Sequence, residues 1–415
     1  MTTLRSAKVL MCASVLATAG LAPAFGQVSP PLGCGSVITT DTTLTAAITN
    51  RSINGLIVDA DKIAIEFNGQ TVSGDGIPAA HDDIHFDYGI LVESHHGVTI
   101  TNGSLSAFDR GVMFDASPGG VVTAMHVHDN SNRGIMFDNG SDTARIKRNT
   151  PTDNGASGIA VVASKGALIT RNRSLRNLGG AGVRLDGATR ATVLHNRLID
   201  NVFAVQATDS QTAYIRGNRM AGGEVGVFMA FSDGYAVSHN RISRTGAGVS
   251  IEGSDRNQFT RNRIVHSVAS ACDGCGIGIQ IYGNHNLVSH NTVIDSPRYG
   301  IEVDDFGDPG HTPAVGNVVL DNAVIHTGVG IAIGPEAGGV VLNTLVARNV
   351  ANQAVDDGIQ LVGPSTGLET STITRNNANH NGDLGIETVP GTNDGGGNRA
   401  AGNGNPLQCL NITCR

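Results

Sequence analysis

Apolar and polar positions along the chain keep fixed distances from a recurring asparagine. Three residues before each asparagine lies an apolar residue such as Ile146 or Val193, and two residues after it the position is usually apolar again. Self-similarity at a period of roughly 20–50 residues indicates a solenoid of stacked repeats. The asparagines are Asn149, Asn172, Asn196, Asn218, Asn240, Asn262, Asn291, Asn322, Asn349 and Asn376.

Each repeat contains three short runs that alternate apolar and polar residues, separated by Gly, Asn, Asp or Ser. This period of two predicts three strands and three turns per repeat, without helices. Strands that stack on their equivalents at about 4.8 Å form a parallel β-helix. We expect the asparagines to enter the turns and to hydrogen-bond along the stack. A glycine before the first strand, as at Gly182 or Gly248, is expected to supply a turn conformation that a side chain would hinder.

Three stretches carry a family resemblance: residues 55–74 (GLIVDADKIAIEFNGQTVSG), 97–105 (GVTITNGSL) and 404–414 (GNPLQCLNITC). Together with the repeat they resemble secreted right-handed parallel β-helix proteins of the pectin-lyase-like superfamily. The resemblance implies an all-β solenoid of about a dozen coils over residues 55–390, with an N-terminal cap at 27–54 and a C-terminal cap at 391–415. Because this superfamily includes lyases, hydrolases, epimerases, phage spikes and non-catalytic proteins, it implies no single activity.

The first 26 residues have the pattern of a secretory signal peptide. Arg5 and Lys8 precede a short apolar run over residues 9–22, and small residues follow. No later stretch is long and apolar enough to span a membrane. We therefore expect a secreted or periplasmic protein.

Five cysteines follow the signal peptide. In an oxidising compartment Cys272 is expected to pair with Cys275, and Cys409 with Cys414, leaving Cys34 odd. The spacing of Cys272 and Cys275 also allows a redox or metal site.

The formal net charge is −8, from 28 basic and 36 acidic residues. This balance argues against a nucleic-acid partner, so binding of any polyanion requires a local basic stripe. Aromatic residues make up only 4% of the chain and tryptophan is absent. Their scarcity argues against the binding of neutral sugars, which usually stack on Trp or Tyr side chains.

Insertions in the C-terminal coils flank the first strand and predict a walled groove. On its floor Glu302 and Asp304 should face outward, about 6.5–7 Å apart, because residues two apart share one face of a strand. That distance suits an acid and a base of an inverting glycosidase. The predicted catalytic residues are Glu302, Asp304, Asp305 and His311.

Other residues around this groove fit substrate or metal. Gln280 and Tyr282 take the equivalent outward positions one coil earlier, and Arg298 lies nearby. Asp304 and Asp308 could hold Ca²⁺, which would acidify the proton α to a uronate carboxylate, with His311, Tyr282 or Arg298 as the base. Asp273 comes from the neighbouring insertion. The alternative is that these acids only solvate a loop surface.

An earlier cluster combines methionines, acids and histidines. Its members are Met113, Asp115, Met136, Asp138, Arg184 and Asp186, with His126 and His128 on a later strand of the intervening coil. This set allows a second carboxylate site that contacts sugar, or a copper site, since Met and His suit copper. Stacked methionines can also simply cover apolar surface.

Arginine follows the asparagine in five successive coils. These residues are Arg173, Arg197, Arg219, Arg241 and Arg263. Like charges at the coil spacing repel one another unless an anion lies against them, and guanidinium groups match carboxylates or sulfates. An acidic polysaccharide would fit, whereas the alternative is that the arginines pair with local acids such as Asp200.

These patterns predict an extracytoplasmic carbohydrate-active protein that binds or acts on an acidic polysaccharide. Its chemistry would be β-elimination, epimerisation or hydrolysis at Glu302 and Asp304. One alternative is a non-catalytic binding or structural β-helix. Another is a copper-related periplasmic accessory protein.

Overall fold

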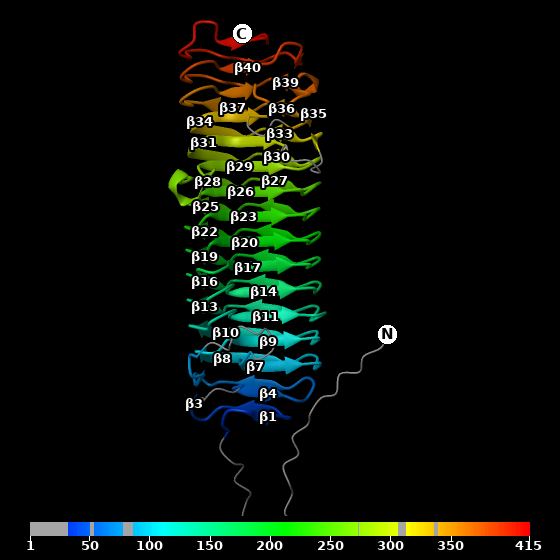
Figure 1. Cartoon of the computed structure of the whole chain (residues 1–415), viewed down its shortest axis with the longest axis vertical. Helices are drawn as coiled ribbons and strands as arrows, with labels where there is room; N and C mark the ends of the chain where they lie inside the picture. The colour runs from blue at the N-terminus through cyan, green and yellow to red at the C-terminus, as the bar shows by residue number, and fades with distance from the viewer. Residues whose placement is uncertain (1–31, 50–53, 78–85, 273, 306–312, 336–338) are drawn as a thin grey trace, which may run out of the picture. The chain divides into compact units, whose positions relative to one another are not determined.

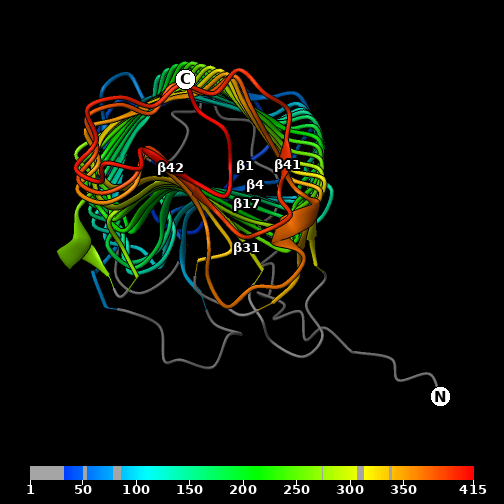
Figure 2. The same ribbon diagram turned by 90° about the horizontal axis from the view of Figure 1, so that it is seen from above.

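The chain folds as a right-handed parallel β-helix, as its repeat predicts. The computed structural model describes residues 32–49, 54–77, 86–272, 274–305, 313–335 and 339–415, and one compact unit spans residues 33–415. Its coils stack along one axis (Figure 1) and superimpose when seen along that axis (Figure 2). They number about 15, slightly more than the dozen predicted. The predicted signal peptide and the residues Asp273, Asp308 and His311 lie outside the described residues.

Each coil contributes strands to three faces, and every pairing between coils is parallel. Face 1 is formed by β1 (Ser36–Ile38), β4 (Leu56–Val58), β7 (Tyr88–Glu93), β9 (Arg110–Asp115), β11 (Ile135–Asp138), β14 (Ile159–Val162), β17 (Ala181–Asp186), β20 (Phe203–Thr208), β23 (Val225–Ala230), β26 (Ala247–Glu252), β29 (Ile277–Tyr282), the second part of β31 (Thr292–Asp304) and of β34 (Ala323–Ile333), β38 (Ile359–Leu361), β40 (Ile386–Thr388) and β42 (Cys409–Leu410).

Face 2 is formed by β2 (Thr42–Thr43), β5 (Ala64–Glu66), the first part of β8 (Thr99–Ser106) and of β10 (Val121–His128), β12 (Arg145–Lys147), β15 (Leu168–Thr170), β18 (Thr192–Leu194), β21 (Tyr214–Arg216), β24 (Ala236–Ser238), β27 (Gln258–Thr260), β30 (Leu287–Ser289), β33 (Val318–Leu320), β36 (Leu345–Ala347), β39 (Thr372–Thr374) and β41 (Asn393–Asp394).

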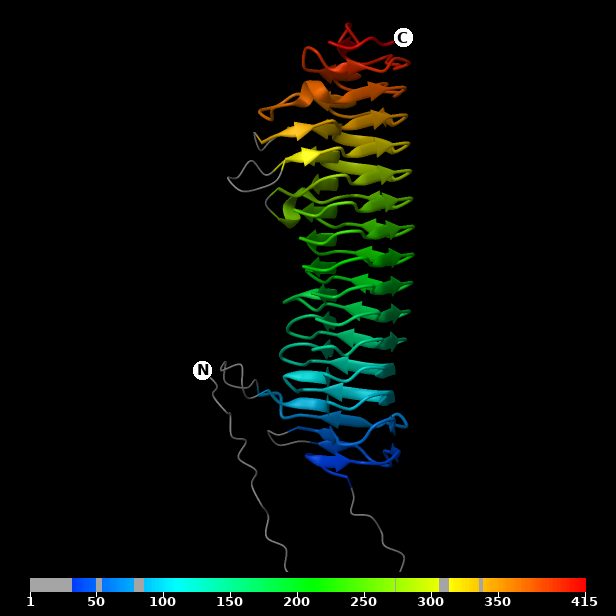
Figure 3. The same cartoon turned by 90° about the vertical axis from the view of Figure 1, so that its right-hand side faces the viewer.

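Face 3 is formed by β3 (Ile48–Thr49), β6 (Thr71–Ser73), the remaining parts of β8, β10, β31 and β34, and β13 (Thr150–Thr152), β16 (Arg173–Leu175), β19 (Arg197–Ile199), β22 (Arg219–Ala221), β25 (Arg241–Ser243), β28 (Arg263–Val265) and β37 (Val350–Asn352). A separate pair, β32 (Ala314–Val315) and β35 (Val341–Leu342), and the 3₁₀ turns η1 (Ala269–Ala271) and η2 (Leu368–Thr370) complete the elements. The loop with η1 projects from the stack (Figure 3).

Alternate side chains of every strand point into the coil and form one continuous apolar core. On face 1, Val227, Val249 and Ile279 lie in register and are fully buried. Two stacked phenylalanines, Phe114 and Phe137, fill the core with ring centroids 4.3 Å apart. Because side-chain direction alternates along each strand, every second side chain points away from this core.

The recurring asparagines form a buried ladder inside the turn between faces 2 and 3. Asn196, for example, donates from its backbone N–H and its side-chain Nδ2 to Oδ1 of Asn218, at 2.8 and 3.1 Å. Nδ2 of Asn218 in turn donates to the carbonyl oxygen of Val193 at 2.9 Å and to Oδ1 of Asn240 at 3.1 Å. The predicted hydrogen bonding along the stack is confirmed.

The glycines before the first strand of each coil are required for a different reason from the one we expected. Gly226, Gly248 and Gly300 do not adopt positive φ. A β-carbon on any of them would instead lie 2.5 Å from the carbonyl oxygen of the corresponding glycine in the next coil. The turn expectation is therefore wrong: close approach between coils excludes a side chain here.

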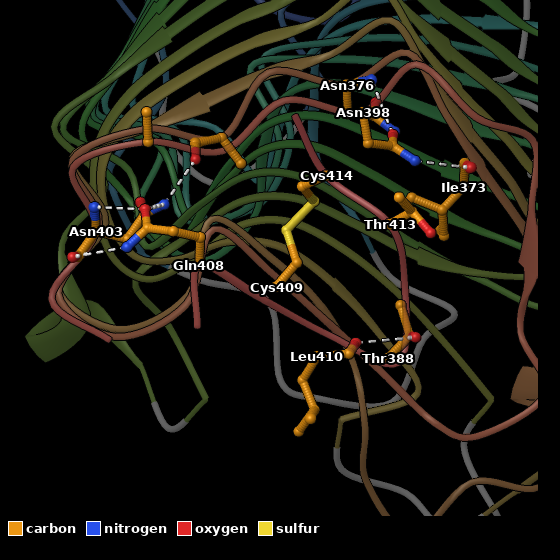
Figure 4. Close-up of a disulfide and its surroundings, with 12 residues drawn as sticks. Ile373, Asn376, Thr388, Asn398, Asn403, Gln408, Cys409, Leu410, Thr413 and Cys414 are labelled. Carbon is orange, nitrogen blue, oxygen red and sulfur yellow. Dashed lines mark hydrogen bonds between the residues drawn. A yellow bond between two sulfur atoms is a disulfide. The ribbon is translucent and has the colours of Figure 1, made fainter. Parts of the chain in front are cut away.

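A disulfide lies inside the last coil. Cys409 pairs with Cys414, and Thr388 donates from Oγ1 to the carbonyl oxygen of Leu410 at 3.4 Å (Figure 4). Cys272 pairs with Cys275, so both local pairs are confirmed. Among the described cysteines Cys34 is free, and its thiol donates to the carbonyl oxygen of Thr49.

Candidate functional site

The predicted groove residues come together on the outward side of β29 and β31. Gln280 lies in register with Glu302, and Tyr282 with Asp304. Nε2 of Gln280 donates to Oε2 of Glu302 at 2.9 Å and to the Tyr282 hydroxyl at 3.0 Å, and that hydroxyl donates to Oε1 of Glu302 at 3.5 Å. The sequence therefore identified a real polar network.

This network is covered, whereas we expected the floor of an open groove. Glu302 and Asp304 are fully buried and Asp305 is almost so. Oδ1 of Asp304 accepts hydrogen bonds from the Ser365 hydroxyl at 2.9 Å and from the Asp305 N–H at 2.8 Å. Oδ2 of Asp305 accepts from the N–H of Val340 at 2.9 Å. These two carboxylates anchor segments of later coils.

The remaining predicted members of the groove lie beside or outside this network. Arg298 has its guanidinium carbon 5.5 Å from the ring centroid of Tyr299. Asp308 and His311 lie outside the described residues. Catalysis at Glu302 and Asp304, and Ca²⁺ binding at Asp304, stay predictions.

Sequence reasoning missed a carboxylate cluster in the turns that lead into β38 and β40 of face 1. One carboxylate oxygen each of Asp356, Asp357 and Asp383 lies within 4.8 Å of the others. In the described part of the chain, these three acids form the group whose spacing would allow a bound cation. Oδ1 of Asp357 accepts from the N–H of Leu384 at 2.7 Å, and Oδ2 accepts from Gln360 at 3.2 Å. The separation of 27 residues between Asp356 and Asp383, one coil, was the available signal.

Burial raises the pKa of Asp357 to about 7, and a hydrogen bond with Glu387 adds to the rise. Between about pH 4 and about pH 7, Asp357 therefore stays protonated in the folded protein, whereas in the unfolded chain, where its pKa is near 3.9, it loses the proton. Because the unfolded state binds fewer protons between these pKa values, stability is highest below about pH 4 for this group and falls as the pH rises to about 7.

We expect Asp357→Asn to flatten this pH dependence of stability. The measurement is the thermal unfolding midpoint at several pH values between about 4 and about 8. Asp209→Asn, at an exposed aspartate of another coil, is the control and should keep the wild-type profile. An unchanged profile in Asp357→Asn would contradict the assignment.

The methionine cluster forms, but without the histidines. Met113, Met136 and Ala160 lie in register on the outside of face 1 and are buried together. His126 and His128 belong to β10 on face 3, where their rings stack 4.2 Å apart.

Copper does not fit this cluster. Nη1 of Arg133 donates to Sδ of Met136 at 3.1 Å, so a cation already lies against one of the two sulfurs. The imidazoles that would complete a Met and His ligand set are on a different face. A copper site made of the methionines and histidines in this set is therefore not formed.

The predicted column of arginines is confirmed on face 3. Neighbouring members lie in register and all five side chains are exposed. Within the described part of the chain no ion pair joins any of them to an acid, so the alternative of pairing with Asp200 is not realised. We call Arg173, Arg197, Arg219, Arg241 and Arg263 the arginine ladder.

Further basic residues line the turn beside the ladder. Two positions before a ladder arginine the backbone has positive φ, near 55°, and the side chain there is exposed. The residues at these positions include Arg171, His195, His239 and Arg261. The ladder and this turn together form a basic strip on a protein whose net charge is −8.

Two hollows flank the projecting loop of η1. Their volumes are about 370 and 600 Å³, and both are lined by Arg244 and Val268. In the larger hollow Asp295 lies 2.9 Å from Nδ1 of His266. Neither hollow includes the Glu302 network or the ladder.

Two family models match parts of the chain. A model described as periplasmic copper-binding protein (NosD) matches residues 32–214, and one described as right handed beta helix region matches residues 164–319. A comparison with curated proteins finds no match. The second match agrees with the parallel coils of the structure, which form a right-handed parallel β-helix.

Several solved structures are similar to this chain. The bacteriophage phi29 gene product 12 is 11% identical over 88% of this chain and 68% of that chain, with a TM-score of 0.56. The periplasmic alginate epimerase AlgG is 14% identical over 74% and 76% of the two chains, with a TM-score of 0.46. The Dettilon tailspike protein is 14% identical over 91% of this chain, with a TM-score of 0.40, and this chain spans only 61% of its length.

Proposed function

We propose that this protein binds an acidic polysaccharide outside the cytoplasm, along the arginine ladder. The observation that carries the proposal is the set of five exposed, registered guanidinium groups without carboxylate partners in the described part of the chain. Two unit charges one coil apart repel by about 1 kcal/mol even in water. Anionic groups bound along the stack would offset this repulsion, because each guanidinium group would then lie against an opposite charge.

The ladder favours a chain with widely spaced charges. One guanidinium per coil gives one cation about every 4.8 Å, close to the length of one sugar residue in an extended polysaccharide. Double-stranded DNA carries one charge per about 1.7 Å, so the ladder would neutralise it poorly. The acidic surface of the rest of the protein also opposes a nucleic acid.

Other observations support the location and favour binding over chemistry. Two disulfides suit an oxidising compartment, and the family model that matches residues 32–214 describes periplasmic proteins. Glu302 and Asp304, the carboxylates that a lyase, epimerase or hydrolase would use, are buried.

Affinity electrophoresis of the full chain tests this function. In native gels we expect polygalacturonate to retard the protein and neutral dextran to leave its mobility unchanged. Added salt should abolish the retardation, since exposed charges are screened. Equal retardation by dextran, or no retardation by polygalacturonate, would contradict the proposal. Stronger retardation by single-stranded DNA would also contradict it and would indicate a nucleic acid as the ligand.

A further inference from the structure

Three half-buried arginines gather on face 1, away from the arginine ladder. Arg110 opens β9, and Arg133 occupies the same position one coil later, where its carbonyl oxygen accepts from the N–H of Gly111 at 3.0 Å. Arg184 lies in β17, in register with the methionine column through Ala160. All three side chains are only partly exposed.

Arg133 is poorly satisfied by hydrogen bonds. Its hydrogen bond within the described residues goes to a thioether sulfur, a weak acceptor, at 3.1 Å. Burial lowers the pKa of its guanidinium, and the charges of Arg110 and Arg184 lower it further. A guanidinium has five donors, so most of the hydrogen-bonding capacity of Arg133 is unused.

The two other guanidinium groups are held in place but keep free donors. Arg110 stacks on Phe86, with its central carbon 4.0 Å from the ring centroid. Nη2 of Arg184 binds Oδ2 of Asp186 at 2.7 Å. In both arginines Nε is buried and has no hydrogen-bond partner among the described residues.

Beside these arginines lies a buried apolar cluster, with acids on its other side. Met113, Met136 and Ala160 form the cluster and are almost fully buried, and Tyr88 and Leu91 pack against them. Two residues beyond the methionines, Asp115 and Asp138 lie in register and partly exposed. Partly exposed cations and hydrogen-bond acceptors thus lie around this buried cluster.

From this arrangement we infer that the cluster of Arg110, Arg133 and Arg184 is a second binding site, which takes one oxyanionic group of an acidic sugar. The carboxylate or sulfate group accepts hydrogen bonds from Arg133 and its neighbours. The hydroxyls of the same sugar donate to Asp115 and Asp138, whose side chains are partly exposed. This site stands on observations independent of the arginine ladder.

Isothermal titration with small sugars tests this site. The ligands are glucuronate, glucose 6-sulfate, glucose and inorganic sulfate. We expect both charged sugars to bind, with the tighter one identifying the anion, and glucose to bind at least tenfold more weakly. Binding of inorganic sulfate as tightly as either sugar, or of glucose as tightly as glucuronate, would overturn the assignment.

Variants separate this site from the ladder. Arg133→Gln should weaken binding of the charged sugars at least tenfold, while Arg190→Gln, at an exposed arginine elsewhere, should leave it unchanged. If Arg133→Gln does not fold, Arg133→Lys keeps the charge and loses the planar fork, and should weaken binding as well. A variant of the arginine ladder should bind glucuronate with the affinity of wild type. Unchanged affinity for the charged sugars in both Arg133 variants would overturn the proposed site.

Discussion

Asn218→Ala is expected to lower the free energy of unfolding by about 3–5 kcal/mol, because several buried polar groups lose their partners at about 1–3 kcal/mol each. The side chain of Asn218 accepts two hydrogen bonds from Asn196 and donates to Val193 and Asn240. Alanine removes all four, and the closed core admits no side chain to replace them.

Chemical denaturation of the variant and of wild type measures this effect. Gln211→Ala, at an exposed side chain of the same coil, is the control and should change stability by no more than about 0.5 kcal/mol. A loss below about 1 kcal/mol in Asn218→Ala would show that the buried asparagine ladder is not a main determinant of stability.

Replacing three ladder arginines is expected to weaken polygalacturonate binding on the order of 100-fold at low salt. The variant combines Arg197→Gln, Arg219→Gln and Arg241→Gln. Each lost charge-assisted contact at an exposed site contributes about 1 kcal/mol, so three contribute about 3 kcal/mol. The side chains are exposed and make no ion pair in the described part of the chain, so the fold should be unaffected.

A charge-matched variant provides the control. Arg176, Arg256 and Arg348 are also exposed, but each already pairs with an aspartate. Changing these three to glutamine alters the net charge equally and should change the affinity by no more than about twofold. Equal losses in both triple variants would mean that binding responds to net charge and not to the ladder.

Most of the fold could be predicted from the repeat, because every coil packs in the same way with the same residue pattern. The constant position of one asparagine in each coil predicted the strands, their register and one turn together. A second buried ladder, through Asn130, Asn154, Asn177 and Asn201, was overlooked although it has the same period. It runs through fewer coils, so its repetition is weaker.

The candidate site was less predictable because it depends on departures from the repeat. Alternation correctly placed Gln280, Tyr282 and Glu302 on the outer side of face 1. Strand alternation says nothing of what covers an outward side chain, so the burial of Glu302 could not be foreseen. The meeting of Asp356 and Asp383 was likewise missed, although their separation of 27 residues equals the coil length between Asn349 and Asn376.

The central claim is that the arginine ladder binds a polyanion through one cation per coil. The most direct test is the affinity for polygalacturonate of wild type and of the ladder variant over a series of salt concentrations. We predict that log K falls linearly with log salt and that losing three contacts makes the slope shallower by about 2, by analogy with single-stranded polyanions. Equal slopes for the two proteins would contradict the account.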